Sequence, residues 1–162
     1  MSIEQGAGET NRLGRKCTIR KLHMMGQVYI PAGNALAAGT DICRVLVYLD
    51  KQSNGAAATV ANILASAIFN SFRNLQNSER FYVLSDKRYT VNAPISGNGT
   101  SSLAGKVLRN WSINKNVNIP LQFDASTGAI TDLTSSNIGV LVISEGQDCY
   151  YKYTWRLRFS DY

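Results

Sequence analysis

Histidine and closely spaced acidic residues are nearly absent from this sequence of 162 residues, and their scarcity excludes most catalytic chemistry. The chain has 1 histidine, so a Ser-His-Asp or Cys-His mechanism would have to use His23, which lies in a basic segment. The acidic residues form no D-x-D or E-x-x-E pair of the kind that glycosidases and two-metal sites use. No glycine cluster is followed by the G-K-[ST] of a phosphate-binding loop. We therefore predict that the protein is not an enzyme and needs no cofactor.

Cysteine is equally sparse. The 3 cysteines, Cys17, Cys43 and Cys149, are far apart and odd in number. This spacing gives neither a zinc site with paired C-x-x-C ligands nor a complete set of disulfides. We expect buried free thiols and no metal.

Long apolar runs are missing too. No stretch reaches the roughly 18 apolar residues of a membrane-spanning helix. The N-terminus lacks the basic segment, apolar segment and cleavage site of a signal peptide. We expect a soluble, unsecreted chain with no membrane partner.

The residues that are abundant favour β structure. Glutamate is scarce, whereas Val, Ile, Leu, Tyr, Thr, Ser, Asn and Gly are plentiful. The length and a hydrophobic content of 44% suffice for one core. Residues 1–14 contain several glycines and no apolar periodicity, so we expect a flexible N-terminal arm there and one folded domain at 15–162.

Period-two alternation predicts the strands. One face of residues 16–30 is apolar, with Gly26 in the gap of the series as a bulge or a close backbone approach. Residues 42–49 are apolar on both sides, which is typical of a central, covered strand. The other expected strands are 80–91 (one broken strand or two short ones), 107–113, 117–123 and 138–144, and the helical spacing within 59–72 predicts one short helix in a loop.

The last strand has the clearest alternation in the sequence. Its apolar face, which we expect to be core rather than a base-stacking surface, consists of Tyr151, Tyr153, Trp155, Leu157 and Phe159. No βαβ alternation occurs along the chain. The sequence therefore predicts an all-β fold, a single jelly-roll β-sandwich of about eight antiparallel strands.

Basic residues are clustered rather than scattered. The formal charge is +6, and no acidic residue occurs between Thr10 and Thr40. A polyanion needs several Lys or Arg side chains that converge on its phosphates, although a solvated surface with a soluble tail would look similar. The candidate nucleic-acid-binding residues are Arg12, Arg15, Lys16, Arg20 and Lys21 near the N-terminus, and Lys152, Arg156 and Arg158 near the C-terminus.

Three segments carry a resemblance to a known family. Residues 11–21 read NRLGRKCTIRK, residues 43–55 read CRVLVYLDKQSNG, and residues 79–91 read ERFYVLSDKRYTV. In this order and spacing they resemble the jelly-roll capsid proteins of circular Rep-encoding single-stranded DNA viruses, and the basic, aromatic last strand fits the same pattern. The resemblance spans nearly the whole chain.

The resemblance implies a structural role. It implies a virion protein that self-assembles into a closed icosahedral T=1 shell of about 60 identical subunits around single-stranded DNA. It also implies assembly in the host nucleus, with an import signal in a long basic N-terminal tail. Only two acidic residues and no cation precede Arg12 here, so we expect that such a tail is missing from this chain.

Two other functions fit parts of the sequence. A non-viral nucleic-acid-binding β-sandwich would share the basic clusters but would stay monomeric or dimeric. A jelly-roll lectin or a cupin-like enzyme fits less well, because one histidine cannot supply the histidine cluster of a cupin metal site.

Overall fold

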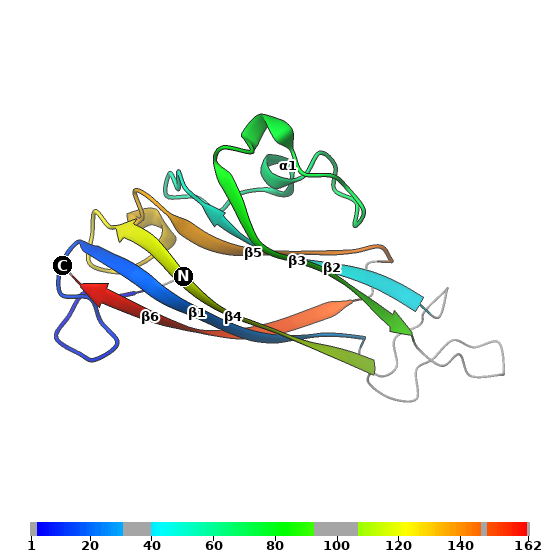
Figure 1. Cartoon of the computed structure of the whole chain (residues 1–162), viewed down its shortest axis with the longest axis horizontal. Coiled ribbons are helices and arrows are strands. Elements are labelled where there is room, and N and C mark those ends of the chain that lie inside the picture. The colour runs from blue at the N-terminus through cyan, green and yellow to red at the C-terminus, as the bar shows by residue number, and fades with distance from the viewer. Residues whose placement is uncertain (1–2, 31–39, 93–106, 147–148, 162) are drawn as a thin grey trace.

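The protein is a β-sandwich of two antiparallel sheets. A computed structural model describes residues 3–30, 40–92, 107–146 and 149–161. One sheet has the strand order β4-β1-β6 and the other has the order β3-β2-β5, and the two sheets face each other (Figure 1). The strands are β1 (Lys16–Ile30), β2 (Thr40–Asp50), β3 (Phe81–Asn92), β4 (Val107–Gln122), β5 (Asn137–Ser144) and β6 (Tyr150–Asp161). The predicted all-β, two-sheet class is confirmed.

The described residues hold 6 strands, fewer than the number expected from the sequence. The expected strands at 107–113 and 117–123 are one continuous strand, β4, because Asn114, Lys115 and Asn116 stay paired with β1 instead of turning. The charged residues Asp86 to Arg88 likewise lie within the single strand β3, and the irregularity in its pairing with β2 falls near Leu84.

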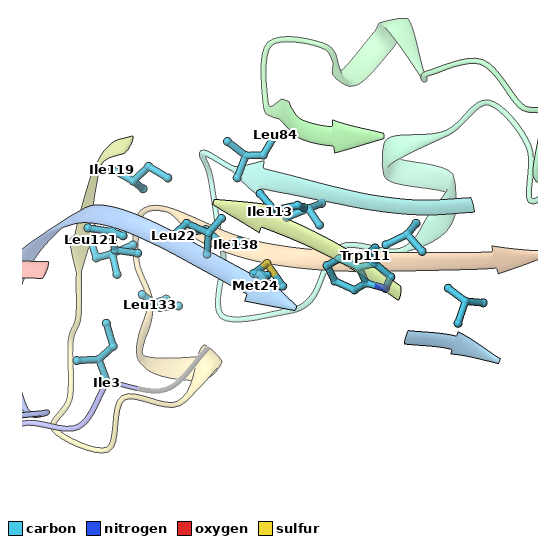
Figure 2. Close-up of a cluster of buried hydrophobic side chains, with 14 of the residues drawn as sticks. Ile3, Leu22, Met24, Leu84, Trp111, Ile113, Ile119, Leu121, Leu133 and Ile138 are labelled. Carbon is cyan, nitrogen blue, oxygen red and sulfur yellow. The ribbon is translucent and has the colours of Figure 1, made fainter. Parts of the chain in front are cut away.

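The main core lies between the sheets, and β1 is its centre. Leu22 and Val28 are fully buried and Met24 is 1% exposed, as the alternation predicts. Figure 2 shows Leu22 and Met24 among Leu84, Trp111 and Ile138, which come from three other strands. Gly26 marks a close approach, because a Cβ there would lie 2.5 Å from the indole ring of Trp111.

A second, smaller core covers the outer face of β2. Leu46 and Tyr48 pack there against Ile63 and Leu64, so β2 is buried on both faces as predicted. The helix α1 (Val60–Ile63) is only one turn long, shorter than the segment expected, because Ile68 beyond it is 55% exposed and has no surface to pack on. No described helix is long and apolar enough to cross a bilayer.

The described part of the N-terminal segment lies against the sandwich and is not a free arm. Ile3 is 5% exposed within the main core, and the backbone N–H of Gln5 donates to the carbonyl of Ser126 at 2.9 Å. Neither contact can be predicted from apolar periodicity, because residues 1–14 have none. The described residues of the expected arm therefore belong to the packed domain.

Strand β6 departs from its predicted burial. Trp155 lies opposite Met24 and Leu157 opposite Leu22, so the apolar side chains do point to the inner side. However, Tyr151 is 52% exposed and Trp155 is 37% exposed, whereas Leu157 and Phe159 are half-buried against the core. Strand β6 is at the edge of its sheet, so its first half lacks the cover that a central strand receives. The prediction that the whole aromatic face is core is wrong for that half.

Candidate nucleic-acid interface

Positive charge is concentrated in one of the two sheets. Strands β4, β1 and β6 carry eight Lys or Arg residues and one acid, Asp161, which is a formal charge of +7 against +6 for the whole chain. Strands β3, β2 and β5 carry three cations and three acids. The excess charge of the protein therefore belongs to one sheet of the sandwich. Two of its cations, Arg109 and Lys115, lie opposite the inward residues Val28 and Leu22, and Lys115 Nζ donates to the carbonyl of Leu84 at 2.6 Å.

A bulge in β1 places two consecutive cations on that face. Ile19 lies opposite Phe159 and Lys21 opposite Arg158, so Arg20 is an extra residue relative to β6. Ile19 and Leu22 are both fully buried. The two residues between them therefore both point away from the core.

The side chain of Arg20 is held on the outer face by neutral groups. Its Nε donates to Ser160 Oγ at 3.0 Å, and its Nη1 donates to Asn118 Oδ1 at 2.6 Å. These bonds orient the guanidinium and leave its charge uncompensated.

Strand β6 adds its cations beside those of β1. Lys21 lies opposite Arg158, His23 opposite Arg156, and Gln27 opposite Lys152. Opposing residues of antiparallel strands share a face, and like charges that oppose each other destabilise the pairing. We call this outer surface the basic face and define it by Arg20, Lys21, His23, Lys152, Arg156 and Arg158.

No acid within the described strands neutralises the basic face. The two ion pairs among the described residues, Arg44–Asp86 at 2.6 Å and Arg80–Asp50 at 2.8 Å, involve residues in or next to the other sheet. Asp161 lies opposite buried Cys17, and its Oδ2 accepts from the N–H of Leu13 at 3.0 Å. An anion that approaches the basic face thus meets cations with no carboxylate to displace.

Strand β4 completes the outer surface with neutral polar groups. Its outward side chains occur at every second position and are short amides and hydroxyls, which suit contacts to sugar and phosphate oxygens. They are Asn110, Ser112, Asn114, Asn116 and Asn118. This alternation is visible in the sequence and is the signal that the sequence analysis missed.

An open groove and an aromatic pair lie toward the C-terminal end of β1. The groove has a volume of about 850 Å³ and is lined by three consecutive residues from each of the strands β1, β4 and β6. Beside it, the rings of Tyr29 and Tyr150 have centroids 5.9 Å apart, and Lys152 Nζ is 5.5 Å from the Tyr29 centroid.

Most of the predicted site residues come together. Five of them, Arg20, Lys21, Lys152, Arg156 and Arg158, lie on the basic face although they are far apart in the chain. Lys16 is exposed at the start of β1, opposite Gln122. Arg15 is exposed just before the strand and lies apart from the group.

Arg12 has another role, and its assignment to nucleic acid is wrong. Its side chain is fully buried, and the guanidinium donates to the carbonyl oxygens of Ile3 (3.2 Å), Gly14 and Ala125. The guanidinium carbon also lies 4.1 Å from the ring centroid of Phe123. Because the guanidinium is buried and bonded to these groups, it cannot contact a phosphate. Arg12 instead anchors the N-terminal segment.

Thiols and metal ligands add no second site. Cys17 and Cys43 are buried and Cys149 is half-buried, all as free cysteines. Burial raises the pKa of the Cys17 thiol to about 11, which keeps it protonated and unreactive near neutral pH. Within the described ranges, no group of three or more His, Cys, Asp or Glu side chains is placed to hold a metal ion.

The outer surface of this sheet therefore combines the cations of β1 and β6 with the neutral polar side chains of β4, and it suits a polyanion. Comparison of the sequence with protein-family models finds no matching family, and comparison with curated proteins finds no significant match.

Proposed function

We propose that the protein is a capsid subunit that self-assembles into a small icosahedral shell and binds single-stranded DNA through its basic face. The observation that carries the proposal is the one-sided charge: +7 on the strands of one sheet against a neutral opposite sheet. Phosphates bind such a surface with release of counterions and without reading sequence. A packaged genome requires this kind of contact.

Exposed apolar side chains support contacts between copies. Tyr151 and Trp155 are exposed on edge strand β6, whereas Phe72 (87% exposed) and Leu75 (82% exposed) lie in the segment between β2 and β3. Two different apolar surfaces on one subunit suit heterologous contacts, which close into a shell when the rotations allow it.

The finer topology is also part of the proposal. The first strand pairs antiparallel with the last, β1 with β6, and the second pairs with the next to last, β2 with β5. This pairing of outer strands supports a jelly roll as the arrangement of the complete chain.

A second candidate is a nucleic-acid-binding β-sandwich that does not assemble. The basic face supports this candidate equally well. The two candidates differ in the mass of the particle that the purified protein forms. Electron microscopy and sedimentation of the purified chain separate them. We expect uniform round particles of many copies at neutral pH and moderate salt. A persistent monomer that still binds DNA would favour the second candidate and reject the shell.

The DNA contact has its own test. Replacing Lys21, Arg156 and Arg158 by Ser removes up to three cations that neutralise phosphates. The slope of log affinity for single-stranded DNA against log salt should therefore shrink by about 0.7 for each phosphate that is no longer neutralised. The control replaces two cations, Lys87 and Arg88, which are exposed on β3 of the other sheet, and should leave the slope unchanged. An equal reduction of the slope in both variants would reject the assignment to the basic face.

A further inference from the structure

The outer surface of the β4-β1-β6 sheet changes its chemistry along β1. Arg20, Lys21 and His23 lie at one end, Met25 and Gln27 follow, and Tyr29 lies at the other end. Tyr29 lies nine positions along the strand from Arg20, which is a distance of roughly 30 Å. The cations and the aromatic pair are thus two ends of one continuous track.

The groove between these ends opens on the outer face. Its lining contains no described residue of the β3-β2-β5 sheet, which would have to contribute if the groove lay between the sheets. The outward side chains that border it combine a thioether, amides, a hydroxyl and one cation: Met25, Gln27, Asn110, Ser112, Lys152 and Thr154. Such a lining accepts flat, partly polar groups and gives no site for a buried carboxylate.

The aromatic end presents one open ring. Tyr150 is 53% exposed, and its ring leans on Tyr29 at an interplanar angle of 30°. Tyr29 belongs to the central strand and is half-buried. Lys152 lies beside this pair, so a cation is available near the open ring. Because its ring already packs on Tyr29, Tyr150 loses less conformational freedom than a free side chain when a planar group stacks on it.

A single strand of nucleic acid offers what both ends of the track require. Its phosphates suit the cations, and its unpaired bases expose faces that stack on aromatic rings, whereas a duplex hides these faces. We propose that the basic face binds single-stranded nucleic acid along β1. Phosphates lie at Arg20, Lys21 and Arg158, intervening nucleotides lie over the groove, and one base stacks on Tyr150. This proposal rests on the proposed DNA-binding function and adds the path of the strand and the residue on which a base stacks.

The test separates stacking from charge. The full chain is titrated with three probes: a ten-nucleotide oligothymidylate, an abasic strand of the same length, and a ten-base-pair duplex. Tyr150→Leu should weaken oligothymidylate binding on the order of tenfold, because stacking contributes about 1–3 kcal/mol per base. Binding of the other two probes should not change. Tyr150→Phe keeps the ring and should bind oligothymidylate nearly as the original protein does.

Matched variants complete the design. Tyr82→Leu changes a tyrosine that is 61% exposed on β3 of the other sheet and should have no effect on any probe. Lys21→Ser with Arg158→Ser should weaken all three probes. If Tyr150→Leu leaves oligothymidylate binding intact, or weakens all three probes equally, base stacking at Tyr150 is overturned while DNA binding stands. If the charge variant weakens none of the probes, the DNA-binding function fails as well.

Discussion

At the scale of single residues, Arg12 and Arg20 show that neighbouring cations in a sequence can have opposite roles. Arg20 is exposed and bonded to two neutral side chains, so its charge faces solvent. Arg12 is fully buried and bonded to three backbone carbonyls. Both belong to the same acid-free segment, and nothing in their local sequence separates them. Tertiary contacts with Ile3 and Ala125 decide the difference.

Replacing Arg12 should therefore unfold or loosen the N-terminal segment. Arg12→Met removes the donors and leaves three carbonyls unsatisfied in a buried setting, which should cost at least about 2 kcal/mol of unfolding free energy. Urea unfolding measures this change. Arg15→Met, a change to an exposed cation three positions away, is the control and should cost little. Equal stability of the two variants would contradict the anchoring role.

The Arg44–Asp86 pair predicts a pH dependence of stability. Two hydrogen bonds from the Arg44 guanidinium, at 2.8 and 2.6 Å, lower the pKa of Asp86 below its usual range. A carboxylate whose pKa is lower in the folded state stabilises the fold above its unfolded pKa of about 3.9, and this contribution is lost as the pH falls through the folded pKa. Unfolding free energies should thus decrease below about pH 4, and Asp86→Asn should flatten this decrease. An identical acid profile in both proteins would show that Asp86 contributes none of it.

At the scale of elements, alternation predicted the strands but not their neighbours. The buried faces of β1 and β2 follow directly from period two, because both strands are central and each inward side chain meets the core. The partial burial of β6 results from its position at the edge of the sheet, and that position is set by the strand order. Strand order arises from long-range pairing and leaves no periodic signal in any one segment.

The sequence predicts most residues of the basic face but not that they lie side by side. The clusters near the two ends of the chain were visible, yet only the pairing of β1 with β6 brings Lys21 beside Arg158. The bulge at Arg20 has no local sequence signal, because the residues around it are ordinary strand formers. The length of helix α1 is overestimated for a related reason. The apolar spacing within 59–72 is helical, but the rest of the domain offers a packing surface for one turn only.

Edge position makes a specific prediction for β6. Because Trp155 is 37% exposed, Trp155→Ala should cost clearly less than the roughly 3–5 kcal/mol of a buried tryptophan. Leu22→Ala, in the fully buried centre of β1, should cost about 2–5 kcal/mol through its cavity. Thermal and urea unfolding of the two variants give the comparison. A larger destabilisation for Trp155 than for Leu22 would place Trp155 in a core contact.

At the scale of the whole molecule, separated charge should orient the protein before it binds. A sheet with a formal +7 facing a neutral sheet creates an asymmetric field that attracts polyanions to one side. Stopped-flow association with single-stranded DNA should therefore slow steeply with salt. Removing Arg156 and Arg158 should slow it further, whereas removing Lys87 and Arg88 should change it little. Equal slowing by both pairs would indicate that only net charge matters.

The bulge at Arg20 also determines which changes of length β1 can accept during evolution. Side chains alternate along a strand, so inserting or deleting one residue elsewhere in β1 would turn one half of the strand over and send Leu22 or Ile19 to solvent. At the bulge, Arg20 and Lys21 already point the same way. Deleting one of them would restore regular alternation along β1 and its match with β6. The offset from β4 would grow, because β4 already has two residues, Val117 and Asn118, opposite Arg20. Related chains should thus vary in length here more readily than elsewhere in β1, and a variant without Arg20 should lose one unit of charge while Ile19 and Leu22 keep facing the core.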